Sequence, residues 1–228
     1  MDVTAALKAR RTVRAFETRP VPETTLRAIL EAALCAPSWA NTQPWEIWAA
    51  SGDKLERIRA AFMERTHRGA PGQPELPPPK QWPEACRERT KALTEGRAKF
   101  AGVSPEDPGF RQDFVLSNRR FFGAPCVVYL CMERSLSSWS VLDLGMMAQS
   151  VMLAAQDLGV ESAIAVNLVF YPDVIRSELG IPEELAIVIG IALGYPDTSD
   201  RADGFRSERR PLEDAVTFVG TADVSPTL

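Results

Sequence analysis

The sequence has few of the side chains from which proteins usually build a catalytic centre of their own. Its 228 residues include one histidine, His67, and four cysteines, no two of which form a Cys-x-x-Cys pair. A zinc site made of cysteine and histidine is therefore poorly supplied, and a serine or cysteine hydrolase would have to use His67. That residue lies near Gly69 and Pro71 in a stretch that we interpret as a solvated loop. We expect no metal site, and a bound cofactor is the natural source of reactivity.

Strong positive charge and long apolar runs are absent as well. The formal net charge is −4 at pH 7, which argues against bulk binding of nucleic acid. The apolar run 185–193 is far shorter than the roughly 20 residues of a membrane helix. No long apolar run follows the first Met, as a signal peptide would require. We expect a cytoplasmic protein with reduced, mostly buried thiols and with neither nucleic acid nor a membrane as a partner.

Helical and extended apolar patterns alternate along the chain, which predicts an α+β layered fold. In the segment that Pro22 opens, apolar residues recur at i, i+3, i+4, i+7 and i+8 from Leu26, and Pro37 ends this helix. Buried strands are expected at 45–50, 124–132, 161–168 and 186–193. Further helices are expected at 2–10, 53–64, 84–100, 140–158 and 172–179.

The composition changes over residues 66–112. Prolines and glycines are so dense in 68–83 that no regular element can form there. A charged helix over 84–100 follows, and then a loop that contains Pro108 and Gly109. The segment has too few large apolar residues for a core of its own. We therefore expect a single domain, 1–228, with 66–112 as an excursion near the active site.

The predicted helix from Ser140 to Leu158 is apolar on nearly every side, whereas ordinary surface helices are not. It is either a central helix buried within one subunit or a helix buried partly by a second subunit. We expect the second arrangement, an obligate dimer.

Two polar segments near the N-terminus suggest a ligand. The basic turn 10–16 supplies three arginines and Thr12, which suit a phosphate. The loop 36–45 supplies hydroxyl and amide groups, which suit a planar heterocycle with donors and acceptors along its edge. Together the two segments indicate a phosphorylated flavin.

In this order the two segments resemble the nitroreductase family of FMN-dependent oxidoreductases. Later features follow the order of the family, and they are Ala124-Pro125, Asp143, Gln149, Gly159, Gly190, Gly194-Tyr195-Pro196 and Arg209-Arg210-Pro211-Leu212. The resemblance implies a mixed, mainly antiparallel sheet flanked by helices. It also implies an intertwined homodimer with two FMN sites, each built from both subunits.

The resemblance also implies the residues that hold the flavin. Those of the basic turn are Arg10, Arg11, Thr12 and Arg14, and those of the loop, contributed by the partner subunit, are Pro37, Ser38, Trp39, Asn41 and Gln43. The backbone near Leu168 and Val169 would face the reactive ring nitrogen, and Arg209 would bind the phosphate. Ser207 stands where many members have a lysine, so Arg206 or Arg210 compensates or fewer cations hold the phosphate. No catalytic side chain is implied, because the flavin performs the redox chemistry.

As an enzyme of this kind, the chain would transfer hydride from NADH or NADPH through FMN to a nitroaromatic acceptor by ping-pong kinetics, giving nitroso and hydroxylamino products. The long excursion resembles the subgroup that reduces nitrobenzoates and dinitroanilines. Acceptor contacts are expected from Phe114, Arg120 and Phe121, and Arg111 or Arg119 could also pair with a substrate carboxylate. The alternatives are a family reductase acting on an enone, a quinone or a halogenated aromatic, and a flavin-binding protein without turnover.

Overall fold

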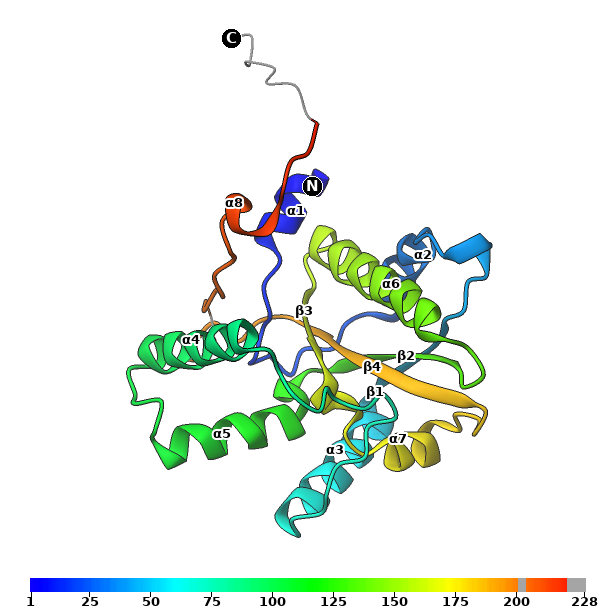
Figure 1. The fold of residues 1–228 in the computed structure, drawn as a ribbon. Coiled ribbons are helices and arrows are strands. Elements are labelled where there is room, and N and C mark those ends of the chain that lie inside the picture. The colour runs from blue at the N-terminus through cyan, green and yellow to red at the C-terminus, as the bar shows by residue number, and fades with distance from the viewer. Residues whose placement is uncertain (201–203, 221–228) are drawn as a thin grey trace.

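A computed structural model describes residues 1–200 and 204–220, with one antiparallel sheet at its centre (Figure 1). The strands are β1 (Glu46–Ser51), β2 (Cys126–Glu133), β3 (Glu161–Ala165) and β4 (Leu185–Gly194), in the order β1-β2-β4-β3. A parallel bridge joins Thr12 to Ser162 of β3. The predicted α+β fold with a mainly antiparallel sheet is confirmed. The third strand is shorter than predicted, because residues 166–169 turn into the 3-10 helix η3 (Val166–Val169).

Helices cover both faces of the sheet (Figure 1). On one face lie α2 (Glu23–Ala33) and α6 (Ser138–Asp157), and on the other lie α3 (Gly52–His67) and α7 (Pro172–Leu179). Side chains of β2 alternate between the two cores: Val128 packs on the side of α2 and α6, and Val127 packs on the side of α3 and α7. This alternation of period two buries both faces of the strand, which explains why its sequence is apolar throughout.

The excursion carries α4 (Glu84–Ala101) and the start of α5 (Pro108–Arg119), which stand to one side of the sheet (Figure 1). The prediction of a loop at Pro108 and Gly109 was therefore wrong, because α5 begins at Pro108. Asp107 accepts a hydrogen bond from the Gly109 N–H at 2.7 Å, and proline is tolerated in the first turn because its missing N–H has no partner there. His67, predicted in a loop, is the last, exposed residue of α3. The remaining elements are α1 (Val3–Ala9), η1 (Trp39–Asn41), η2 (Phe121–Gly123) and α8 (Leu212–Ala215).

The four cysteines are free thiols. Cys126 and Cys131 are buried as expected, whereas Cys35 is exposed and Cys86 is half-buried. Burial raises the pKa of the Cys126 thiol to about 12, so this thiol stays protonated and inert. Within the described part of the chain, no helix is both long and apolar enough to cross a membrane.

Gly190 brings η3 against the centre of the sheet. A Cβ atom at this position of β4 would lie 2.6 Å from the Cβ of Leu168, a distance that two side chains cannot share, so only glycine allows the close approach. On the neighbouring strand β3, the Ser162 carbonyl accepts a hydrogen bond from the Val13 N–H at 3.0 Å. The basic turn and η3 are therefore both fixed to the β3–β4 end of the sheet.

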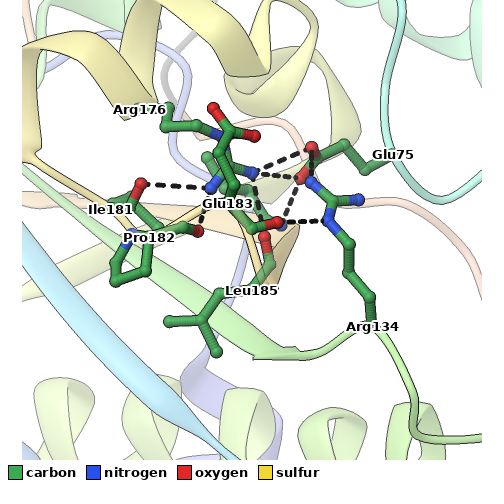
Figure 2. Close-up of polar contacts among 8 residues, drawn as sticks. Glu75, Arg134, Arg176, Ile181, Pro182, Glu183 and Leu185 are labelled. Carbon is green, nitrogen blue, oxygen red and sulfur yellow. Dashed lines mark hydrogen bonds and ion pairs between the residues drawn. The ribbon is translucent and has the colours of Figure 1, made fainter.

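A cluster of ionic contacts fixes the proline-rich segment that precedes α4 (Figure 2). Glu75 accepts hydrogen bonds from Arg134, from Nη2 of Arg176 at 2.9 Å and from the Ile187 N–H. Arg176 is buried on α7 and also donates to the Leu185 carbonyl at 2.9 Å. Burial by itself raises the pKa of Glu75, but the hydrogen bonds from Ile187, Arg134 and Arg176 outweigh it and lower the pKa. One carboxylate thus ties an irregular segment to α7 and β4.

Replacing Glu75 should cost stability. Glu75→Ala leaves Arg176 buried without its carboxylate, and we expect the free energy of unfolding in urea at pH 7 to fall by about 3 kcal/mol. Glu183→Ala is the matched control, because its carboxylate lies 3.4 Å from Nε of Arg176 but is 85% exposed, and it should cost less than about 0.5 kcal/mol.

The same pair should respond to pH. A depressed pKa in the folded state means that Glu75 stabilises the fold above its unfolded pKa, near 4.5, and that this contribution is lost as the pH falls through the folded value. The difference between wild type and Glu75→Ala should therefore shrink below about pH 4. A difference that stays constant from pH 7 to pH 3 would contradict this role for Glu75.

Candidate functional site

Residues from both ends of the chain line one cavity of about 290 Å³. The turn after α1 and the segment after β4 meet there, and in Figure 1 the N-terminus and this C-terminal segment come together at the same end of the molecule. Among the lining residues are Arg10, Arg11, Thr12, Arg14, Phe205, Arg206, Ser207 and Arg209. The structure thus brings together all four predicted residues of the basic turn and the predicted phosphate arginine.

The guanidinium groups of this cavity repel one another. Burial lowers the pKa of Arg10 and the charge of Arg209 lowers it further, whereas Glu161 raises it and Arg206 adds a smaller lowering effect. Burial also lowers the pKa of Arg14, whose one hydrogen bond goes to the Thr12 carbonyl at 3.2 Å. Among the residues that the structure describes, no ion pair joins Arg10, Arg14 or Arg209 to a carboxylate. Partly buried cations that form no ion pair with a carboxylate provide a site for an anion.

Arg206, Ser207 and Arg209 lie on the C-terminal side of the cavity. Arg206 donates to the carbonyls of Lys8 and Ala9, both at 3.0 Å, and so satisfies the end of α1 while lining the cavity. The Ser207 hydroxyl accepts from Nη1 of Arg209 at 2.7 Å and orients it. Arg210 donates to the Asp214 carbonyl instead and is not among the cavity residues. Of the two arginines expected to compensate, Arg206 is the one in place.

The second predicted flavin segment lines a different cavity, of about 550 Å³. Its walls are Pro37, Ser38 and Trp39 of the loop and Trp139, Leu142, Asp143 and Met146 of α6. Asp143 is buried and accepts a hydrogen bond from the Trp39 N–H at 3.1 Å, which holds the loop on α6. The two cavities share no lining residue. Within one chain, the two halves of the predicted FMN site are therefore separate.

The loop is strained. Ala40, Asn41 and Gln43 have φ values of 49°, 56° and 47°, in the left-handed region that costs a residue with a Cβ atom about 1 kcal/mol or more. The Ser38 hydroxyl accepts from the Gln43 N–H at 2.9 Å and closes the loop. Strain of this kind persists where the surrounding structure fixes it, and it gathers at ligand sites.

A third cavity, of about 520 Å³, lies between α4, α5 and the basic turn. Two of the three predicted acceptor contacts, Phe114 and Arg120, line it. Phe121 does not, because its ring is fully buried and packs edge-to-face on Phe62 at 4.9 Å between centroids. The expectation for Phe121 therefore does not match its place in the core.

The other two arginines considered for a substrate carboxylate, Arg111 and Arg119, contact groups of the protein. Nε of Arg111 donates to the Pro105 carbonyl at 3.1 Å. Arg119 donates to Oδ1 of Asn167 at 2.7 Å and lies 3.5 Å from the centre of the Phe170 ring. Arg119 thereby holds η3, where the side chains of Leu168 and Val169 are buried. That their backbone faces the reactive ring stays a prediction, because both residues are buried in this chain and line none of the three cavities.

Sequence reasoning missed Arg97, which lines the third cavity from α4. Its pKa is lowered to about 10, first by burial and then by the charge of Arg14. In the sequence it is one of many charges in a polar helix, and nothing in the pattern separates it from solvated neighbours. In the described part of the chain, no group of three or more His, Cys, Asp and Glu side chains could hold a metal ion.

Comparisons with known proteins agree with this geometry. A model of the nitroreductase family matches residues 7–195. The chain is 34% identical to chloronitrobenzene nitroreductase of Comamonas testosteroni, over 93% of this chain and 95% of that protein. It is 29% identical to 4-nitrobenzoate reductase of a Nocardioides species, over 96% and 90%. The crystal structure of the FMN-dependent nitroreductase NfnB from Mycobacterium smegmatis in complex with NADPH superposes with a TM-score of 0.88 and 31% identity, covering 96% of this chain and all of that one.

The strain in the loop is measurable. Ala40→Gly removes the Cβ atom from a left-handed residue, so we expect the free energy of unfolding in urea to rise by about 0.5 kcal/mol or more. Ala28→Gly, at an exposed position inside α2, should lower it by about 1 kcal/mol. Equal losses in the two variants would show that the loop carries no such strain.

Proposed function

This chain belongs to the nitroreductase family, and we propose that it is an FMN-dependent oxidoreductase that uses NADH or NADPH to reduce nitroaromatic compounds. Bound FMN would supply the hydride transfer, in two-electron steps that lead to nitroso and hydroxylamino products. The observation that carries the proposal is the first cavity, where Arg10, Arg14 and Arg209 come together and form no ion pair with a carboxylate among the described residues. Relatives named for chloronitrobenzene and 4-nitrobenzoate support the acceptor class.

The residues of the first cavity fit the phosphate end of FMN. Arg10, Arg14 and Arg209 would supply charge-assisted hydrogen bonds to the phosphate, and Thr12 a hydroxyl. Arg206 would add positive charge while it remains bound to α1. The backbone of Leu168 and Val169 in η3 would donate toward the reactive ring. No side chain of the protein is assigned a covalent role.

We propose that two copies of the chain form the complete site. Trp39, Trp139 and Leu142 are 65%, 60% and 56% exposed on the α6 face, a large apolar exposure for one region of a protein. The opposite side of α6, with Leu144 and Met147, is buried in the chain's own core. A second copy seated on the exposed side would bring the loop 37–43 to the basic turn of its partner. This arrangement accounts for two half-sites that share no residue.

We also propose that the chain is one domain in which the excursion 66–112, together with α5, encloses the acceptor. The third cavity, which these helices form with the basic turn, supports this assignment. The four free thiols support a reducing compartment, and we propose the cytoplasm.

A disrupted α6 face should separate the subunits. Leu142→Glu places a charge on the exposed apolar side of the helix, so we expect sedimentation to show a shift from dimer to monomer together with a loss of bound FMN. Val115→Glu makes the same change at a 46% exposed position on α5 and should leave both unchanged. A Leu142→Glu protein that remains a dimer with full FMN content would refute this interface.

Absorption spectroscopy tests the function directly. The purified protein, or the protein given FMN, should show flavin bands that bleach with NADPH or NADH without oxygen and return with 4-nitrobenzoate. Arg209→Ala removes a charged phosphate contact and should weaken FMN binding by roughly tenfold or more, whereas Arg210→Ala should not. A protein that takes up no FMN would overturn the proposal, and bleached flavin that only an enone or a quinone restores would reassign the acceptor.

A further inference from the structure

The third cavity contains two arginines that form no ion pair with another described residue. Arg97 of α4 and Arg14 of the basic turn both line it, and they are close enough for the charge of Arg14 to lower the pKa of Arg97. Arg14 also lines the first cavity, so the two cavities adjoin at this residue. Two partly buried cations that repel each other cost free energy unless an anion lies beside them.

The acidic residues of the cavity do not serve as that anion. Asp107, Asp113 and Asp200 contribute to its wall, yet no ion pair between described residues joins any of them to Arg97 or Arg14. Oδ1 of Asp107 already caps α5 through the Gly109 N–H. What Arg97 does contact is an aromatic ring, since its Cζ atom lies 4.1 Å from the centre of Phe114. This contact fixes the guanidinium over the ring face and leaves its N–H groups to bind a ligand.

We propose that Arg97, with Arg14 beside it, binds an oxyanion carried by the substrate that enters the third cavity. Phe110 and Phe114 give this cavity aromatic walls, and its volume of about 520 Å³ suits an aromatic molecule of modest size. The inference rests on the proposed function and assigns Arg97 to substrate specificity. The oxyanion is either the carboxylate of an acceptor such as a nitrobenzoate or the extra phosphate that NADPH carries and NADH lacks, and both have the planar or branched oxygen pattern that a guanidinium recognises.

Arg97→Gln distinguishes these two sources. We would measure kcat/KM for 4-nitrobenzoate and for uncharged nitrobenzene, each with NADPH and with NADH. If Arg97 binds the acceptor, kcat/KM for 4-nitrobenzoate should fall at least tenfold while that for nitrobenzene changes less than about twofold. If Arg97 binds the extra phosphate of NADPH, the loss should appear with NADPH and not with NADH, equally for both acceptors.

Two further variants and one binding measurement complete the test. Arg87→Gln removes the same charge from an exposed position of α4. It should change neither the ratio of kcat/KM for 4-nitrobenzoate to that for nitrobenzene nor the ratio of kcat/KM with NADPH to that with NADH. Arg97→Lys should retain part of whichever ratio Arg97→Gln lowers. Calorimetry of the oxidised protein should show the matching loss of affinity in Arg97→Gln. The affinity for 4-nitrobenzoate should fall if Arg97 binds the acceptor, and the affinity for NADP⁺ relative to NAD⁺ should fall if Arg97 binds the extra phosphate. Ratios equal to those of wild type, or loss of FMN from Arg97→Gln, would overturn the inference. If wild type binds no FMN or reduces neither nitro compound, the proposed function itself fails.

Discussion

Repulsion between guanidinium groups that are partly removed from water is the constraint on which this molecule's site depends. Arg14 is at its centre, because it lines the two cavities assigned to FMN and to the substrate, with Arg10 and Arg209 on one side and Arg97 on the other. Such a cluster opposes folding until an anion fills it. The rest of the fold must therefore supply enough packing to hold these cations together before any ligand arrives.

That packing comes from elements without any chemical role. The sheet is buried on both faces, and Gly190 and Ser162 connect it to η3 and to the basic turn. Glu75 ties the proline-rich segment to α7 and β4, and α4 follows it directly. Arg97 thus reaches the cavity from a helix that follows this attached segment in the chain.

The sheet and most helices were predictable because their apolar periodicity is local. Where local rules compete, prediction failed: Pro108 suggested a loop although proline fits a first helical turn, and residues 166–168 were predicted to extend the strand although the chain turns there. The cofactor residues came from the order of short motifs that resembles one family. Arg97 and the burial of Phe121 depend on how distant elements pack, which no periodicity in the sequence records.

The contact between α1 and the segment after β4 has a consequence for the protein's susceptibility to proteolysis. Arg206 binds the carbonyls that end α1, and Phe205 packs on Phe100 of α4 at 5.8 Å between ring centres. A ligand in the cavity between these segments adds its binding free energy to their attachment to each other. Loss of the ligand and separation of these two segments are then linked equilibria, so we expect proteases to cut them more often in the empty protein than in the filled one.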